Sequence, residues 1–203
     1  MLHERNIKFI FKDRRNYVQG PDIYDGILET VKDLFEEYPI EITGSFHRLL
    51  NTNGICRIYH DSDEIKYEGT SANFSFKLKN KTYHATILDS YSTISSRREY
   101  DEKQIIKGHN VNDNCVALTV KSNYSYMEQI VAITKLLHLH LYPEASGKWL
   151  FTKIQIRDFT DPIQFIGHQC KVFNKRHFNY ILTQNSIYID NTPIGNIWFS
   201  LQK

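Results

Sequence analysis

The sequence contains few of the residues that mark several classes of protein. Its 203 residues include three cysteines, nine glycines and five prolines. Three cysteines far apart favour reduced thiols over a disulfide framework. The low glycine and proline content argues against disorder and against a glycine-rich phosphate loop. No uncharged apolar run reaches the roughly 18 residues of a membrane-spanning helix, and the first residues lack the apolar core of a signal peptide. We therefore expect a cytoplasmic protein without a membrane partner.

Charge is balanced and aromatic residues are abundant. Lysine and arginine together number 25 and aspartate and glutamate 23, for a formal net charge of +2. This balance argues against nucleic acid as a default partner. The 13 tyrosines and 12 phenylalanines favour a β-rich core, because aromatic side chains suit pleated, half-buried surfaces.

Two segments, residues 22–37 and 125–141, have the apolar spacing of an amphipathic helix. Asp22 after Pro21 is the predicted N-cap of the first helix, and Ser125 and Glu128 have the spacing of a capping box at the second. Apolar runs predict strands around both helices. These runs are residues 7–13, 40–50, 54–60, 64–69, 73–78 and 82–88 in the first half, and 115–121, 149–156, 165–173, 178–183, 186–190 and 195–201 in the second.

Both halves run strand, helix, then several strands, which indicates an internal repeat. An offset of about 103 residues aligns Asp25 with Glu128, and one of about 105 aligns Phe46 with Phe151. We expect these two phenylalanines to be equivalent and largely buried. The predicted organisation is a first half over residues 1–92, a polar linker over 93–113 and a second half over 114–203.

One helix between a first strand and an antiparallel run of longer strands resembles the hot-dog fold, and two copies resemble a double hot-dog. The resemblance implies an α+β protein, a tandem hot-dog whose antiparallel sheet wraps two central helices. Residues 16–28 are similar to the loop and first helical turns of the β-hydroxyacyl carrier-protein dehydratases. With Gly26 placed on that family's helix glycine, Tyr17 falls at the position of the catalytic His and Val31 at that of the acid. The family's standard His–acid pair is therefore absent.

The resemblance implies a protein that binds or acts on an acyl thioester, dehydratase-like or thioesterase-like, in a lipid or secondary-metabolite pathway. It implies acyl-CoA or an acyl carrier protein as partner, allows a homodimer, and implies no metal and no cofactor. The thioester would lie at a helix N-terminus, where N–H groups and the helix dipole stabilise an oxyanion. The implied site residues are Asp25, Glu128, Tyr17 and His47 for catalysis, and Gln19, Gly20, Ser125 and Tyr126 for substrate binding.

Two other functions fit parts of the same sequence. A non-catalytic hot-dog module that holds an acyl group or a protein would explain the missing His–acid pair, and Asp25 and Glu128 would then only stabilise their helices. His84-Ala-Thr86 matches the His-x-Thr motif of the two-histidine phosphoesterases. That chemistry needs a second copy and another fold, and the nearest second copy is the segment 168–170, His-Gln-Cys.

Two further patterns are weaker indications of a site. His138 and His140 would point about 200° apart on a helix, so they do not form a metal-binding pair there. Two isolated basic pairs, Arg14–Arg15 and Arg97–Arg98, could meet a phosphopantetheine arm or a carrier protein, although such pairs are usually solvated.

Overall fold

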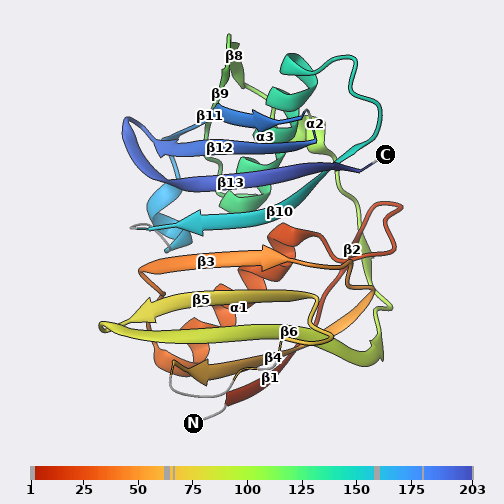
Figure 1. Cartoon of the computed structure of the whole chain (residues 1–203), viewed down its shortest axis with the longest axis vertical. Helices are drawn as coiled ribbons and strands as arrows, with labels where there is room; N and C mark the ends of the chain where they lie inside the picture. The colour runs from red at the N-terminus through yellow and green to blue at the C-terminus, as the bar shows by residue number, and fades with distance from the viewer. Residues whose placement is uncertain (1–2, 62–64, 66, 158–160, 180, 203) are drawn as a thin grey trace. The chain divides into compact units, whose positions relative to one another are not determined.

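Figure 1 shows a computed structural model of the chain, which describes residues 3–61, 65, 67–157, 161–179 and 181–202. The chain divides into two compact units, Met1–Asp101 and Glu102–Lys203, hereafter unit 1 and unit 2. This division falls within the polar segment 93–113 that the sequence analysis expects as a linker. In each unit a long helix lies on one face of an antiparallel sheet (Figure 1).

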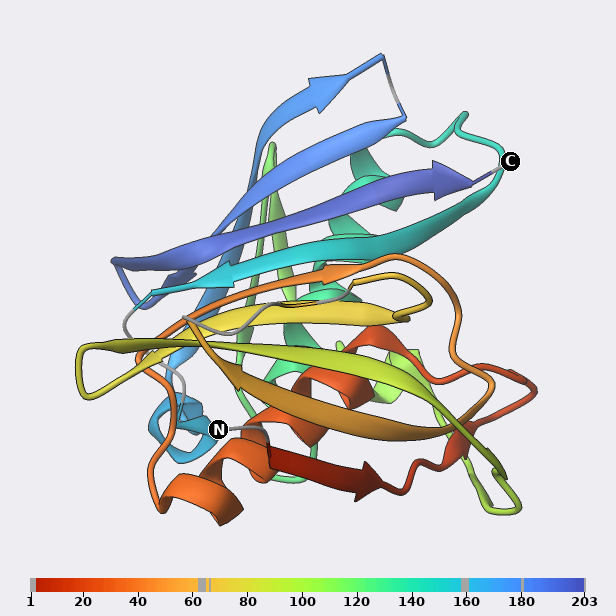
Figure 2. The ribbon, with the colours of Figure 1, turned by 60° about the horizontal axis from the view of Figure 1, so that its bottom comes forward.

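Unit 1 contains one long helix and a curved antiparallel sheet that bends around it (Figure 2). Its strands pair in the spatial order β1-β4-β6-β5-β3, and β2 pairs with β7 in a separate short parallel ribbon. Its elements are β1 (His3–Ile7), β2 (Phe11–Lys12), α1 (Gly20–Phe35), β3 (Glu41–Phe46), β4 (Thr52–His60), β5 (Ala72–Leu78), β6 (Lys81–Thr93) and β7 (Arg97–Arg98).

Helix α1 begins two residues earlier than its apolar pattern predicts. Pro21 lies within the first turn rather than before it, and Gln19 is the N-cap, so the prediction that Asp22 caps this helix is wrong. Proline is favoured in a first turn because its fixed φ suits the helix and its missing N–H would have no partner there. The helix ends at Phe35, where Glu36 adopts a left-handed conformation and donates its N–H to the carbonyl of Lys32.

Unit 2 repeats the sequence of elements: a strand, a long helix and then four strands. Its strands pair antiparallel in the spatial order β10-β13-β12-β11-β9-β8. Its elements are α2 (Glu102–Ile105), β8 (Asn110–Asn112), β9 (Cys115–Thr119), α3 (Tyr126–Leu141), β10 (Lys148–Ile156), a 3₁₀ turn η1 (Pro162–Phe165), β11 (Gln169–Phe178), β12 (Leu182–Ile189) and β13 (Thr192–Gln202).

The two units place their last hairpin differently. In unit 2 only residues 179–181 connect β11 to β12, and so short a connection forces the two strands to be neighbours. In unit 1 the connection from β4 to β5 is longer, residues 61–71. This length allows β6 to lie between β4 and β5 and to pair with both. The order of elements along the chain is therefore shared, whereas the order of strands across the sheet is not.

Several predicted strands need correction. Ile65 and residues 67–69 are not in a strand, and the other residues of the predicted strand 64–69 lie outside the described part of the chain. Phe165 belongs to the η1 turn rather than to a strand. The predicted strand 178–183 spans the turn between β11 and β12 instead, because β11 extends as far as Phe178.

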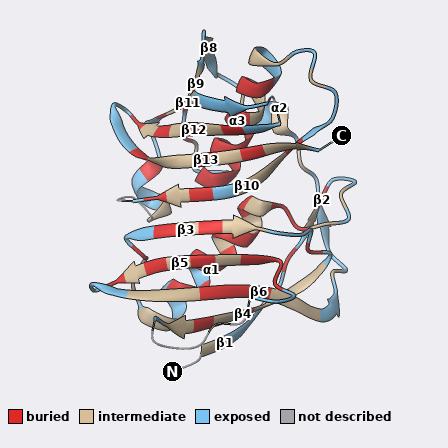
Figure 3. Ribbon diagram, in the orientation of Figure 1, coloured by how far each residue is buried: buried red, intermediate tan, exposed pale blue. Residues whose placement is uncertain are grey.

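The core consists of the buried residues of each helix and its sheet, and the ribbon is red at these residues in Figure 3. Phe46 and Phe151 are only half-buried, so the prediction that both are largely buried is wrong. Phe46 contacts Phe74 edge-on and Phe151 stacks on Phe199, and both residues are nevertheless partly exposed. Among the described residues, no helix is long and apolar enough to cross a membrane.

Candidate functional site

The start of α1 is held by its backbone and by Arg15 rather than by a side-chain cap. Val18 donates its N–H to the carbonyl of Leu50 over 2.7 Å, which holds the preceding loop against the sheet. The side-chain oxygen of Gln19 accepts from Nε and Nη1 of Arg15, at 3.0 and 3.1 Å. The Gln19 side chain makes no capping hydrogen bond to the helix. The N-cap side chain of α1 therefore does not cap the first-turn N–H groups, whereas the N-cap side chain of α3 does.

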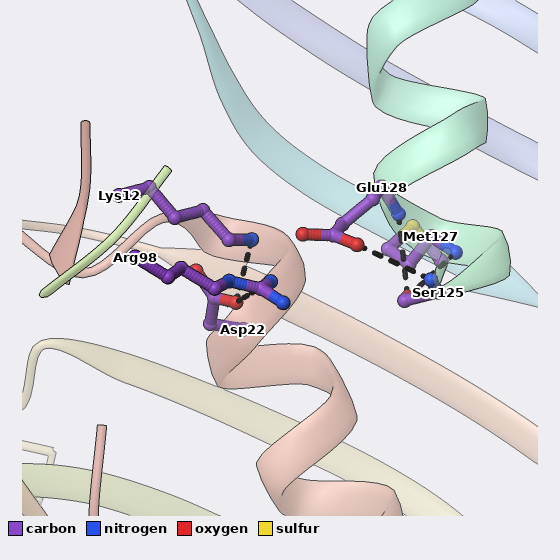
Figure 4. Close-up of polar contacts among 6 residues, drawn as sticks. All are labelled: Lys12, Asp22, Arg98, Ser125, Met127 and Glu128. Atoms are coloured by element: carbon purple, nitrogen blue, oxygen red, sulfur yellow. Dashed lines mark hydrogen bonds and ion pairs between the residues drawn. The ribbon is translucent and has the colours of Figure 1, made fainter. Parts of the chain in front are cut away.

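A buried ammonium group lies beside the first turn of α1 (Figure 4). Lys12 on β2 is 1% exposed, and its Nζ is 2.6 Å from Oδ1 of Asp22. Nη2 of Arg98 on β7 is 3.8 Å from the same oxygen. Because the positive end of the helix dipole disfavours a buried cation, the Asp22 carboxylate is needed to offset the charge of Lys12.

The β2–β7 ribbon brings together basic residues that are far apart in sequence. Phe11 pairs with Arg97 and Lys12 with Arg98. Nη1 of Arg97 donates to the carbonyl oxygens of Asp13 and Arg15. We call Lys12, Arg15, Arg97 and Arg98 the basic cluster. Three of its residues come from the two basic pairs of the sequence, Arg14–Arg15 and Arg97–Arg98. The fourth, Lys12, belongs to neither pair.

Tyr100 provides an aromatic surface within this cluster. The centre of its ring is 4.9 Å from Nζ of Lys12 and 5.2 Å from Cζ of Arg15. A ring face attracts cations through its quadrupole, so Tyr100 helps Asp22 to stabilise closely spaced positive charges. Sequence reasoning missed both Lys12 and Tyr100, because no local pattern signals a pairing between β2 and β7.

The earlier start of α1 changes which carboxylate occupies its first turn. Counted from the N-caps Gln19 and Ser125, Asp22 and Glu128 occupy the same position. Asp25 lies one turn further along, so its predicted place in the first turn, equivalent to Glu128, is wrong. The cause is the N-cap at Gln19, which is three residues before the predicted one.

Helix α3 begins with the predicted capping box (Figure 4). Oγ of Ser125 accepts from the N–H groups of Met127 and Glu128, at 3.1 and 3.3 Å, and Oε2 of Glu128 accepts from the N–H of Ser125 at 3.2 Å. Glu128 is buried. Both residues are therefore engaged in holding the helix start.

Further contacts fix the loop before α3. The buried side chain of Gln129 donates to the carbonyl of Lys121 and accepts from its N–H, both over 2.9 Å. Tyr126 is buried and stacks on Phe165 of η1, with ring centres 4.2 Å apart. The contacts of Ser125, Tyr126 and Glu128 thus hold the start of α3 in place.

We expect Ser125→Ala to lower the free energy of unfolding by about 1 kcal/mol, because two helix N–H groups lose their acceptor. Urea unfolding measures this loss. Ser122→Ala, in the exposed part of the preceding loop, is the matched control and should change stability by less than about 0.5 kcal/mol. Equal effects of the two changes would contradict a stabilising role for the capping box.

The remaining predicted residues of unit 1 lie in different surroundings. Tyr17 and Asp25 are half-buried on either side of the start of α1, and Gly20 is its first residue. His47 follows the end of β3, is exposed, and donates from Nε2 to Oδ1 of Asn73 over 2.9 Å. The described contact of the His47 ring is thus with β5, whereas Tyr17, Gly20 and Asp25 share the start of α1.

A second polar group, missed by the sequence analysis, is buried in unit 2. His138 on α3 and Thr183 and Asn185 on β12 are all fully buried. Nε2 of His138 is 2.9 Å from Oγ1 of Thr183 and 3.3 Å from Nδ2 of Asn185. Because an amide nitrogen only donates, Nε2 is the acceptor and the ring proton is on Nδ1. Among the described residues Nδ1 has no hydrogen-bond partner.

Burial lowers the pKa of His138 to about 4. The ring is therefore neutral at pH 7. His140, two residues on, is exposed, in agreement with the prediction that the two rings point to different faces of the helix. The described residues include no group of three or more His, Cys, Asp or Glu side chains that could hold a metal.

The cysteines are poor nucleophiles in these surroundings. Burial raises the pKa of both Cys56 and Cys170 to about 12. Burial also raises the pKa of Cys115, against the opposing charge of Lys171. All three are free thiols, and a thiolate rather than a thiol is the nucleophile.

Several solved structures resemble this chain over almost its whole length. The dehydratase domain of PpsC from Mycobacterium tuberculosis, in complex with C12:1-CoA, has a TM-score of 0.54 and 8% identity, with 99% of this chain and 93% of that chain covered. The tesB protein of Mycobacterium avium subs paratuberculosis has a TM-score of 0.52 and 8% identity, covering 97% and 91%. A hot-dog fold protein of unknown function from Alicyclobacillus acidocaldarius has a TM-score of 0.50 and 7% identity, covering 100% and 93%.

These likenesses identify the fold. The chain is an α+β protein with antiparallel sheet and few helices, similar to hot-dog proteins, as the sequence resemblance predicts. No protein-family model matches the chain, and no curated protein matches its sequence. The phosphoesterase alternative needed a different fold and is therefore not supported. His84 of its motif is paired instead with Asp61, with Nε2 2.9 Å from Oδ1.

Proposed function

We propose that this protein binds an acyl thioester, carried by CoA or by an acyl carrier protein, with the thioester at the N-terminus of α1. The supporting observation is the difference between the two helix starts. The capping box occupies the first turn of α3, whereas no N-cap side chain bonds to the first turn of α1. First-turn N–H groups are donors that suit a thioester carbonyl or an oxyanion.

The fold and the charges near α1 support the same substrate class. Among proteins of similar fold, the PpsC dehydratase domain is in complex with C12:1-CoA. CoA and the phosphopantetheine arm of a carrier protein both carry phosphate, which the partly exposed guanidinium of Arg98 would attract. Lys12 would add a positive charge near the carbonyl.

For catalysis we propose Asp25 as the base, with Tyr17 as a donor to the substrate carbonyl. Both residues are half-buried, Tyr17 in the loop just before α1 and Asp25 in its second turn. Asp22 forms an ion pair with Lys12, and Glu128 belongs to the capping box of α3, so both carboxylates have structural roles. His47, whose ring contacts Asn73, is a weaker candidate than either. Gln19 and Gly20 would position the thioester.

The alternative is a non-catalytic module of the same fold. The engagement of both first-turn carboxylates in structural contacts favours it. The two functions differ only in turnover, so one set of measurements separates them.

The test is to titrate dodecanoyl-CoA into the protein by calorimetry and to follow release of the free CoA thiol. We expect saturable binding, loss of turnover in a folded Asp25→Asn variant, and weaker binding in Gln19→Ala. Glu128→Gln is the matched control and should lower the melting temperature while leaving turnover intact. Binding without thiol release would exclude thioester hydrolysis and leave the non-catalytic module or a dehydratase. Absence of binding to dodecanoyl-CoA and to a dodecanoyl carrier protein would contradict the proposal.

We further propose that the chain is a tandem of two hot-dog halves, over residues 1–92 and 114–203, with a linker between them. The shared order of strand, helix and four strands supports this organisation. The different placement of the last hairpin implies that the halves have diverged in connection length since any duplication.

A further inference from the structure

Two β-bulges in unit 2 turn cationic side chains away from the helix and onto the outer face of the sheet. On β10, Phe151 pairs with Phe199 and Lys153 with Trp198, so Thr152 is the extra residue. Its hydroxyl donates to the carbonyl of Trp198 over 3.2 Å, which stabilises the bulge. In a regular strand Lys153 would lie on the same face as Phe151, whereas the bulge places it beside Trp198.

The bulge on β11 has the same effect from the other side of the sheet. Asn174 pairs with Asn185 and Arg176 with Gln184, which makes Lys175 the extra residue. Asn185 faces the helix and is buried, so Arg176 would face the helix too if the strand were regular. The bulge instead places the exposed Arg176 on the outer face.

Both displaced cations lie in a single row across four strands. The register pairs Arg176 with Gln184, Gln184 with Trp198, and Trp198 with Lys153. Nζ of Lys153 is 5.1 Å from the centre of the Trp198 ring. The row therefore consists of a cation, an amide, an indole and a second cation, in the order β11, β12, β13 and β10. It lies on the face of the sheet opposite α3. That face is turned toward the viewer in Figure 3.

Aromatic and polar side chains continue this surface on the neighbouring rows. The rings of Phe173 and Tyr188 are 5.2 Å apart in an edge-on contact. Tyr188 pairs with Lys171, and Ser186 donates to Oδ1 of Asn196 over 3.2 Å. All of these side chains are half-buried, so part of each remains accessible on the outer face.

The sheet of unit 2 is also charged with one sign. Strands β9 to β13 contain no aspartate or glutamate, and they contain Lys148, Lys153, Lys171, Lys175 and Arg176. The strands of unit 1 differ, because they contain the acidic residues Glu4, Glu41 and Asp89 as well as basic ones. The net charge of the whole chain is therefore close to zero although the sheet of unit 2 is basic and carries aromatic side chains.

We propose that this outer face of unit 2 binds single-stranded nucleic acid. Phosphates would contact Lys153, Arg176 and Lys171, bases would stack on Trp198 and Tyr188, and amides such as Gln184 would reach base edges. Proteins that bind single strands combine these groups, a positive surface along the backbone and aromatic rings under the bases. This inference is independent of acyl-thioester binding and concerns a different part of the chain.

The test measures fluorescence anisotropy of a labelled oligothymidylate of about 12 nucleotides, a length within known single-strand site sizes. We expect saturable binding that Trp198→Ala weakens about tenfold and Trp198→Phe largely retains, because loss of one stacked base costs about that much. Replacing Lys153 and Arg176 with alanine should weaken binding and reduce the slope of log affinity against log salt by about 1.4, which is about 0.7 per lost phosphate contact.

Lys77→Ala, on the sheet of unit 1, is the matched control and should leave the affinity unchanged. Melting temperatures of all variants show whether a loss of affinity comes from unfolding, and the Lys153 and Arg176 changes spare the core. The proposal is overturned if the oligonucleotide does not saturate the protein. It is also overturned if well-folded Trp198→Ala binds as tightly as the original chain, or if Lys77→Ala weakens binding as much as the changes on unit 2.

Discussion

Replacing Lys12 with alanine is expected to lower the free energy of unfolding by about 3–5 kcal/mol, the usual cost of removing one partner from a buried ion pair. Lys12 is 1% exposed and 2.6 Å from Asp22. Its loss removes an ion pair of 2.6 Å from Asp22, whose ion pair with Arg98 is longer at 3.8 Å, and removes the contact between Lys12 and the ring of Tyr100. Urea unfolding followed by circular dichroism measures the change.

A double-mutant cycle shows whether the effect belongs to the pair. Replacing Lys12 with methionine and Asp22 with leucine together should recover most of the stability, because a buried ion pair and an apolar pair of similar volume are often equivalent. Lys8→Ala, an exposed lysine of the same segment, should change stability by less than about 0.5 kcal/mol. A Lys12→Ala variant as stable as Lys8→Ala would contradict the burial of this charge.

Stability is expected to decrease by about 3 kcal/mol as the pH falls from about 6.5 to about 4, through His138 alone. Burial lowers the pKa of His138 from 6.5 to about 4. Between these values the unfolded chain binds a proton that the folded chain does not, so lower pH favours unfolding. Each pKa unit is equivalent to about 1.36 kcal/mol, and above about pH 6.5 the contribution of His138 no longer changes.

His138→Gln isolates this contribution, because glutamine can still hydrogen-bond to Thr183 but does not titrate. The free energy of unfolding of this variant, measured by urea titration at intervals between pH 4 and 7, should depend less on pH than that of the original chain. His140→Gln is the matched control, since His140 is exposed on the same helix. If both variants keep the full pH dependence, another group is responsible.

At the start of α1 the local sequence pattern predicts the helix but not its N-cap. The apolar spacing of residues 22–37 predicts a helix, and α1 occupies Gly20–Phe35. The same pattern does not distinguish a proline before the helix from one in its first turn. The difference of three residues in the N-cap moves Asp22 into the position expected of Asp25, and with it the assignment of the first-turn carboxylate.

The start of α3 was predictable in more detail because its signals lie within four residues of one another. Ser125 and Glu128 satisfy each other's backbone groups, so their spacing alone predicts the capping box that the structure contains. The hairpin between β5 and β6 also depends on neighbouring residues, because Lys79 and Asn80 both adopt positive φ in its turn.

The basic cluster, the buried histidine and the bulged row needed the tertiary structure. Lys12 meets Arg98 because β2 pairs with β7 across more than 80 residues, and His138 meets Thr183 because α3 lies on β12. Arg176 and Lys153 lie on the outer face only because each strand has one extra residue, and one residue reverses every side chain after it.

The sequence by itself therefore determined the element types, the capped helix and the likeness to a hot-dog fold, because interactions within a few residues, repeated along the chain, produce these features. The tertiary structure alone decided which charges are buried, which carboxylate occupies a helix start and which face of a strand a cation occupies. These depend on strand register and on contacts between distant segments. The energies of these charged groups depend on burial and on separations of a few ångströms. Neither quantity follows from the order of residues in the sequence.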